Sequence, residues 1–254
     1  MDPTISIVIP IHGQLHYTKQ CLAAIHRFTK LPYEVILVDN GSAKKTAQFV
    51  TIQDHRMGER VRGLRNDVNR GFAASMNQGM RQAKGDYLVL LNNDTLPSYR
   101  WAEQLLAPFR QDPSVGMTGP VSNRVIPEQK IKVSITRRKA IHRFCRRFNQ
   151  ANPARWRESK RLSGFCLALP RRVWQRVGEW DECFGLGTYE DDDYSYRIRK
   201  EGLRLIVAGD TYVHHFGSRS FRKRGSKEFY KILGQNRRYF LRKWNLSTPP
   251  GGLI

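Results

Sequence analysis

The chain has no long hydrophobic run and few cysteines. No apolar stretch approaches the roughly 18 residues that cross a membrane, and residues 5–11 are too short for the apolar region of a signal peptide. The four cysteines, at positions 21, 145, 166 and 183, form no C-x-x-C pair and no zinc-like spacing. These absences disfavour a membrane-spanning protein, a disulfide scaffold and a structural zinc site. We therefore expect reduced thiols and a cytoplasmic protein, at most peripheral at the inner face of a membrane.

Four catalytic signatures are also missing. The chain contains no G-x-G-x-x-G, no G-x-x-x-x-G-K-[ST], no H-E-x-x-H and no G-x-S-x-G. A dinucleotide oxidoreductase, a P-loop ATPase, a zincin protease and an α/β-hydrolase are therefore disfavoured. The chain has 254 residues, of which 40% are hydrophobic and 26% are charged. This composition is typical of a folded globular protein.

The net charge of +22 is concentrated in two segments. Residues 137–161 and 219–243 each contain ten Lys or Arg and one acid, so together they carry +18. The rest of the chain is nearly neutral. Such basic segments suit an anionic membrane surface, a polyanionic substrate or nucleic acid, and they equally suit a solvated surface or a contact with a further domain.

Hydrophobic patterning predicts strands that alternate with helices in the first hundred residues. The expected strands are 5–10, 34–38, 60–64 and 87–91, and the expected helices are 14–28, 43–50 and 73–83. This order predicts an α/β fold with a mostly parallel sheet and helices on both faces. In such a sheet the ligand lies outside the carboxyl ends of the strands.

The pattern is looser after residue 100. We expect helices at 101–109, 171–177 and 193–200, strands at 163–169, 203–207 and 211–213, and a basic amphipathic helix at 228–244. Residues 120–160 are polar, basic and poorly periodic, which predicts a long loop or a mobile arm. We divide the chain into a Rossmann-like first half (1–100), a second half (101–218) and a C-terminal basic helix with its tail (219–254).

Polar residues follow several of these strands. Asp39 could accept hydrogen bonds from a nucleobase or a ribose, or it could cap a turn. Asp94, after Asn92 and Asn93, suits a hard divalent cation that also binds phosphate oxygens, although a turn motif would use the same residues.

Three further segments are candidates for the site. Residues 190–193 are four adjacent acids; crowding raises the pKa of at least one, which suits a general base, and the same charges favour a helix N-terminus. His214 and His215 follow a short apolar strand, and they either complete a metal site or have a purely structural role. The segment Asn69-Arg70-Gly71 precedes a helix start that would attract phosphate.

In this order the segments resemble the family 2 glycosyltransferases, which have the GT-A fold. The similarity covers about residues 4–220. The matching stretches are SIVIPIHGQ (6–14), EVILVDNGS (34–42), NRGFAASMNQG (69–79), GDYLVLLNND (85–94), SGFCLALPRRVWQRVGEWDE (163–182), YEDDDYSYRIRKEG (189–202) and VHHFGS (213–218).

The resemblance implies a nucleotide-sugar donor, a divalent cation (Mn²⁺ or Mg²⁺) and inversion at the anomeric carbon. It makes 1–100 the nucleotide-sugar-binding half and 101–218 the acceptor-binding and catalytic half of one GT-A domain. It assigns Asp191 as general base, Glu190 and Gly164 to the acceptor side, and Asp94 with His214 to the metal. The donor residues it implies are Pro10, His12, Asp39, Asn69, Arg70, Gly71, Asn92 and Asn93. Two departures stand out: the first carboxylate of the D-x-D motif is Asn92, and Asp192 adds a second candidate for the base.

We therefore expect an inverting, metal-dependent hexosyl- or deoxyhexosyltransferase. It would move a sugar from a nucleoside diphosphate, with UDP or dTDP favoured over GDP, to a hydroxyl of a glycan, a lipid-linked glycan or a protein. Cell-surface polysaccharide or glycoconjugate synthesis is the expected setting. The alternatives are a basic nucleic-acid-binding protein, which would not need the acidic residues, and a sugar nucleotidyltransferase, which would carry a glycine-rich basic loop after its first strand.

Overall fold

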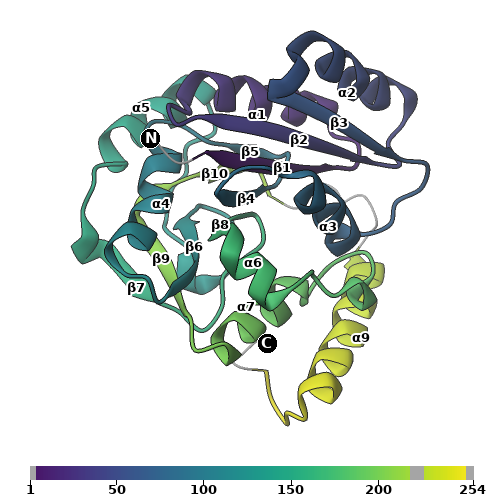
Figure 1. Cartoon of the computed structure of the whole chain (residues 1–254), viewed down its shortest axis with the longest axis vertical. Coiled ribbons are helices and arrows are strands. Elements are labelled where there is room, and N and C mark those ends of the chain that lie inside the picture. The colour runs from purple at the N-terminus through teal and green to yellow at the C-terminus, as the bar shows by residue number, and fades with distance from the viewer. Residues whose placement is uncertain (1–3, 218–225, 250–254) are drawn as a thin grey trace.

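The computed structural model describes residues 4–217 and 226–249, and its centre is one mixed sheet (Figure 1). Across the sheet the strands are β3 (Val61–Asn66), β2 (Tyr33–Asn40), β1 (Ile5–Ile11), β4 (Tyr87–Leu91), β8 (Cys166–Pro170), β6 (Val115–Val121), β9 (Arg204–Tyr212) and β7 (Trp156–Glu158). Strands β3, β2, β1 and β4 are parallel to their neighbours within this group, as are β6 and β9; β8 and β7 run antiparallel. The predicted mostly parallel α/β sheet is confirmed.

Buried strands at the centre of the sheet need helices on both faces. In β1, for example, Ile5, Ile7, Val8, Ile9 and Ile11 are all buried. Helices α1 (Leu15–Phe28) and α2 (Lys44–Met57) lie on one face, and α3 (Phe72–Gln82) lies on the other (Figure 1). Helices α4 (Trp101–Gln111) and α6 (Arg171–Val177) pack on the second half of the same sheet. The two predicted halves therefore share one sheet and one apolar core.

A short two-stranded ribbon crosses the carboxyl edge of the sheet. It pairs β5 (Thr95–Leu96) with β10 (His214–His215), antiparallel, with His215 opposite Thr95. The residues at positions 94 and 215, far apart in sequence, are therefore side by side.

The prediction of a loop or arm at 120–160 is wrong. This region contains helix α5 (Arg138–Phe148) and the edge strand β7. Ile141, Phe144, Cys145 and Phe148 have helical spacing and face the core, but the cations between them lower the mean hydropathy and obscured that pattern. Three smaller corrections follow: β6 was missed, β9 is one strand where two were predicted, and the helix predicted at 193–200 begins at Glu190 as α7 (Glu190–Lys200).

The predicted C-terminal helix is present as α9 (Ser226–Trp244). Its residue Phe240 is fully buried and packs with Phe184 and Tyr189 in a small separate apolar cluster. Helix α9 therefore lies against the segment that precedes α7, as Figure 1 shows in yellow and green. Among the described residues no helix has the length and hydropathy to cross a bilayer.

Candidate active site

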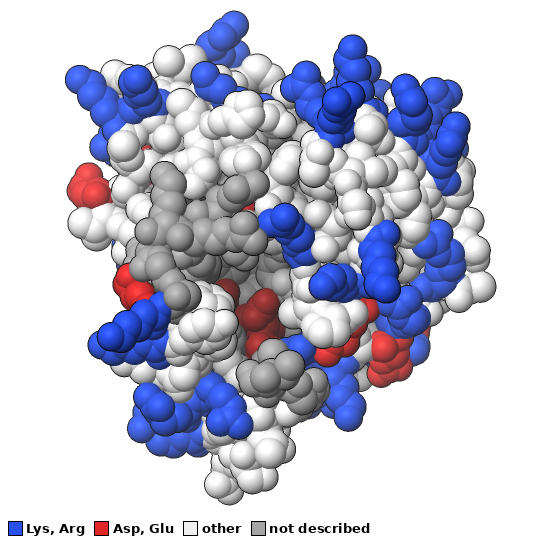
Figure 2. Space-filling model, turned by 180° about the vertical axis from the view of Figure 1, so that it is seen from behind, with Lys and Arg blue, Asp and Glu red and all other residues white. Residues whose placement is uncertain are grey.

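The carboxyl ends of β1, β2 and β4 open into a cavity of about 280 Å³. Figure 2 shows acidic side chains at the bottom of a hollow, and Lys and Arg side chains scattered over the rest of that face. The cavity is lined by Pro10, Ile11, His12, Asn40, Asn69, Gly71, Phe72, Asn92, Asn93, Asp94, Ser163, Gly164, Phe165, Leu186, Gly187, Thr188, Glu190, Asp191, His215 and Phe229.

Ten of the thirteen predicted site residues line this one cavity, and the other three do not. Asp39 is fully buried at the end of β2, Arg70 contributes its backbone N–H to Asn40, and His214 bonds the Tyr212 hydroxyl at 2.9 Å through its Nδ1. The structure thus brings most of the predicted donor and acceptor residues and Asp94 to one cavity, but not His214.

Asp39 and Asn40 end β2 with different partners. The Asp39 Oδ1 accepts the Ser42 N–H at 3.1 Å, while its buried Oδ2 has no hydrogen-bond partner within residues 4–217 and 226–249. A buried oxygen without a partner costs free energy unless a ligand donates to it. Asp39 therefore holds an unpartnered acceptor directly before Asn40, which lines the cavity.

Sequence reasoning missed Asn40, which fixes the segment at 69–71. Its Nδ2 donates to Asn69 Oδ1 at 2.8 Å and to the Gly71 carbonyl at 3.0 Å, and its Oδ1 accepts the Arg70 N–H at 2.9 Å. The His12 ring bonds the Asn40 carbonyl at 2.9 Å. The sequence could have pointed to Asn40, because an amide side chain at the end of a central strand is rarely buried unless it forms such hydrogen bonds.

The side chain of Asn93 forms hydrogen bonds within the protein rather than pointing into solvent. Its Nδ2 donates to Thr18 Oγ1 at 2.9 Å and to the Gly13 carbonyl at 3.3 Å, which anchors the turn after β4 to the start of α1. These bonds hold the turn in place, and Asp94 directly precedes strand β5 of the ribbon.

His215, and not the predicted His214, lies beside Asp94. The Nε2 of His215 is 3.2 Å from Asp94 Oδ1, and its Nδ1 is 2.7 Å from the Arg124 carbonyl. Because a carbonyl only accepts, Nδ1 donates its proton to it, which leaves Nε2 on the side of the ring that faces Asp94. Neighbouring residues of a strand point to opposite sides, so only one of the two histidines can face the cavity. Burial lowers the pKa of the other, His214, to about 4.

Three acids of the first turn of α7 lie in different environments. Asp191 accepts the Gly164 N–H on Oδ2 at 2.9 Å and the Asp192 N–H on Oδ1 at 3.0 Å. Asp192 pairs with Arg161 at 3.4 Å, and Arg161 also pairs with Glu128 at 3.0 Å. Glu190 is buried, and its Oε2 has no hydrogen-bond partner in the described ranges.

Burial dominates the protonation of these acids. Desolvation raises the pKa of Asp191, opposed by the Gly164 and Asp192 N–H groups, and raises that of Asp192 to about 7. Desolvation and the neighbouring Asp191 charge raise the pKa of Glu190 well above its usual value. A carboxyl group with a raised pKa can take a proton in the neutral pH range, which a general base requires.

An α/β sheet of this topology, with an aspartate after β4 and an acidic helix start on the same cavity, defines the GT-A type of nucleotide-sugar protein. Residues 6–174 match glycosyl transferase family 2, and the chain belongs to this family.

Curated relatives agree with this assignment. The chain is 32% identical over 108 residues to glycosyltransferase AglE of Haloferax volcanii, covering 40% of this chain and 34% of that protein. It is 24% identical over 272 residues to chondroitin synthase of Escherichia coli, covering 94% of this chain and 39% of that protein. The chain therefore spans between a third and two fifths of the length of these relatives.

Two solved structures share the fold. GalNAc-T7 with UDP, GalNAc and Mn²⁺ superposes with a TM-score of 0.68 at 20% identity, covering 86% of this chain and 44% of that one. The mannosyltransferase PcManGT of Pyrobaculum calidifontis, with GDP-Man and Mn²⁺, gives 0.66 at 19% identity, covering 98% of this chain and 66% of that one.

Proposed function

We propose that the chain transfers a sugar, with inversion, from a nucleoside-diphosphate sugar to an acceptor hydroxyl. The observation that carries the proposal is that one cavity at the carboxyl edge of the sheet is lined by Asp191, by the Asp94–His215 pair, and by Asn69 and Gly71. The proposed setting is the synthesis of a cell-surface polysaccharide or glycoconjugate. In support, the relatives include a chondroitin synthase and an O-antigen biosynthesis protein.

The donor would bind across the ends of β1 and β2. The unpartnered Oδ2 of Asp39 would accept an N–H of the base or a ribose hydroxyl, and the ordered segment 69–71 would contact the base and the sugar. UDP and dTDP remain the favoured carriers, and the comparison structures with UDP and with GDP-Man support testing both classes.

Asp191 would act as the general base. The acceptor oxygen attacks the anomeric carbon, its proton passes to Asp191, and the bond between that carbon and the diphosphate oxygen breaks, releasing the nucleoside diphosphate. The Gly164 N–H orients the carboxylate, and burial keeps its basicity high. General base catalysis typically contributes about 10²–10⁴-fold.

Asp94 and His215 fit a divalent cation such as Mn²⁺ or Mg²⁺. The pair provides a buried carboxylate and a ring nitrogen whose tautomer is set by the Arg124 carbonyl, a combination usual in metal sites. No group of three potential metal-ligating side chains occurs among the described residues, so water and diphosphate oxygens would complete the shell. When bound, the cation neutralises charge on the leaving diphosphate.

A panel of UDP-, dTDP- and GDP-sugars, measured by thermal shift with and without Mn²⁺, tests the donor. Asp191→Asn should then lose at least about a hundredfold in turnover while keeping donor binding. Glu59→Gln, which makes the same chemical change at an exposed site, is the control. A fully active Asp191→Asn enzyme would remove Asp191 from the role. Release of pyrophosphate in place of nucleoside diphosphate would identify a nucleotidyltransferase.

The basic surface supports attachment to an anionic membrane. All five cations of α5 are exposed, and within the described residues none of them pairs with an acid: Arg138, Lys139, Arg143, Arg146 and Arg147. The exposed Arg27 of α1 lies near this surface, because its guanidinium lies over the Phe28 ring and that ring packs against His142 of α5. Each Lys or Arg near such a surface contributes about 1 kcal/mol. Co-sedimentation with anionic vesicles, lost at high salt, is the expected result; a gel shift with nucleic acid and no vesicle binding would contradict it.

A further inference from the structure

The segment Gly185–Tyr189 has an unfavourable backbone conformation and lines the cavity. Leu186, Gly187 and Thr188 are lining residues, and Glu190 and Asp191 follow directly. Thr188 and Tyr189 both have positive φ, 78° and 68°, in the left-handed region that side chains with a Cβ disfavour. Such a conformation persists only where the surroundings hold it in place.

One side chain of α9 binds the middle of this segment and the residue that precedes it. The Nδ2 of Asn236 lies 2.8 Å from the Phe184 carbonyl, 2.8 Å from the Gly187 carbonyl and 3.0 Å from the Thr188 carbonyl. The Thr188 hydroxyl is 3.1 Å from the same nitrogen. Asn236 is buried, so water does not satisfy these groups in its place.

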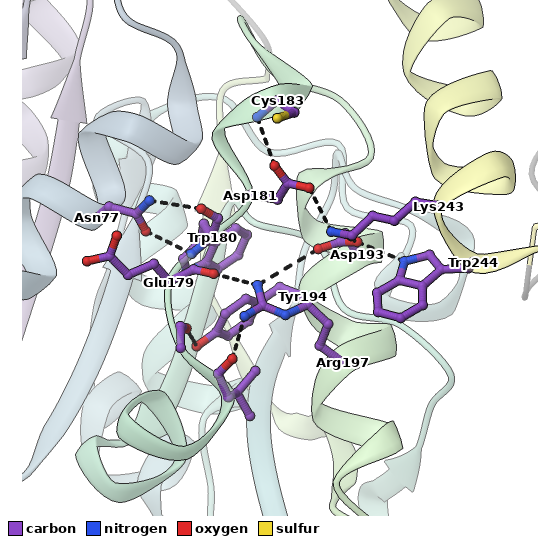
Figure 3. Close-up of polar contacts among 12 residues, drawn as sticks. Asn77, Glu179, Trp180, Asp181, Cys183, Asp193, Tyr194, Arg197, Lys243 and Trp244 are labelled. Atoms are coloured by element: carbon purple, nitrogen blue, oxygen red, sulfur yellow. Dashed lines mark hydrogen bonds and ion pairs between the residues drawn. The ribbon is translucent and has the colours of Figure 1, made fainter.

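A second set of contacts joins α9 to both sides of the segment (Figure 3). Before it, Asp181 Oδ2 accepts from the Tyr239 hydroxyl at 2.8 Å and from Lys243 Nζ at 2.7 Å. After it, Asp193 in the first turn of α7 accepts from Trp244 Nε1 at 2.8 Å, and Lys243 Nζ is also 2.7 Å from the same oxygen. Lys243 therefore joins the approach to the segment and the acidic helix start that contains Asp191.

The same segment touches the donor side of the cavity. A Cβ built on Gly71 would lie 1.9 Å from the Gly185 carbonyl oxygen, so the two backbones are in direct contact. Displacing Gly185–Tyr189 would therefore disturb the groups at 69–71 as well as the start of α7.

From these contacts we propose that α9 positions the active site, with Asn236 as the principal positioning residue. Its amide fixes Gly185–Tyr189, and this segment in turn sets the placement of the α7 carboxylates relative to the 69–71 segment. The inference rests on the proposed function, because it assigns α9 a role in sugar transfer. Asn236 touches no substrate in this scheme and acts through the segment.

Asn236→Asp tests the proposal most directly, because it keeps the shape of the side chain and removes the amide donor. We expect kcat to fall at least tenfold, and the acid limb of the kcat–pH profile to move, because the surroundings of Asp191 change. Gln235→Ala is the matched control, an exposed amide one residue away on α9, and should behave like the parent. A purely structural role would lower the unfolding midpoint and leave kcat and its pH profile unchanged at low temperature; that result would overturn the proposal.

Tyr239→Phe is the milder variant, since it removes one hydrogen bond to Asp181, and we expect a smaller change in the same direction. Amide hydrogen exchange of residues 184–190 gives a readout that does not depend on activity. Exchange should rise in Asn236→Asp and stay unchanged in Gln235→Ala. Unchanged exchange in both variants would refute the positioning contact. Increased exchange in Asn236→Asp, found together with a parent protein that transfers no sugar, would refute the proposed function instead.

Discussion

Gly71→Ala should damage both the stability and the activity of the protein. Gly71 has φ +93°, and its added Cβ would lie 1.9 Å from the Gly185 oxygen and 2.7 Å from the Gly185 carbonyl carbon. The backbone conformation alone costs about 1–3 kcal/mol for a residue with a side chain. The overlap is with backbone, which cannot rotate away, and overpacking of this kind typically adds about 1–3 kcal/mol. We expect a loss of about 2–6 kcal/mol in the free energy of unfolding.

The assay is chemical denaturation, with kcat/KM for sugar transfer measured on the same preparations. Gly202→Ala is the control, because Gly202 also has positive φ (+73°) but no heavy atom lies within 4 Å of its added Cβ. The control should lose about 1 kcal/mol and keep its activity. Equal losses of unfolding free energy in the two variants would show that the close contact between Gly71 and Gly185 does not affect stability, which would refute this prediction.

Three further predictions concern charge. First, kcat/KM should rise with pH through the raised pKa of Asp191, since only the ionised carboxylate takes a proton, and a flat pH–rate profile would contradict this. Second, the pKa of Asp192, raised from 3.8 to about 7, means that its protonated form stabilises the fold below pH 4 and that this contribution is lost as the pH rises to about 7. Across this pH range the free energy of unfolding should decline less in Asp192→Asn than in the parent protein, by at most about 4 kcal/mol. An identical decline in both would refute the shift. Third, Asp39→Asn should weaken nucleoside-diphosphate binding by about tenfold or more in calorimetry, because a hydrogen bond to a charged acceptor is lost, while unchanged affinity would exclude contact with the nucleotide.

The first half of the fold was predictable because its strands are buried on both faces. Such strands are continuous apolar runs, and polar residues mark where each one ends; Asp39 and Asp94 were found this way. The same rule places their side chains at one edge of the sheet. The order of the elements and the position of the cavity could therefore both be predicted from local sequence.

The missed features depend on pairing between distant residues. Whether His214 or His215 faces the cavity depends on how β10 pairs with β5, more than a hundred residues earlier. The apolar face of α5 is narrow, and Arg side chains stand between its buried positions. The contacts of Asn236 with backbone carbonyls leave no sequence pattern, because a carbonyl is the same at every residue.

The cysteines differ sharply in their access to solvent. Cys21, Cys145 and Cys166 are buried, whereas Cys183 is exposed and lies between Asp181 and the Gly185–Tyr189 segment. Burial raises the pKa of the Cys21 and Cys145 thiols to about 12, which makes them poor nucleophiles. An alkylating fluorophore should therefore label the native protein at one site, giving a built-in optical probe two residues from the segment that α9 binds.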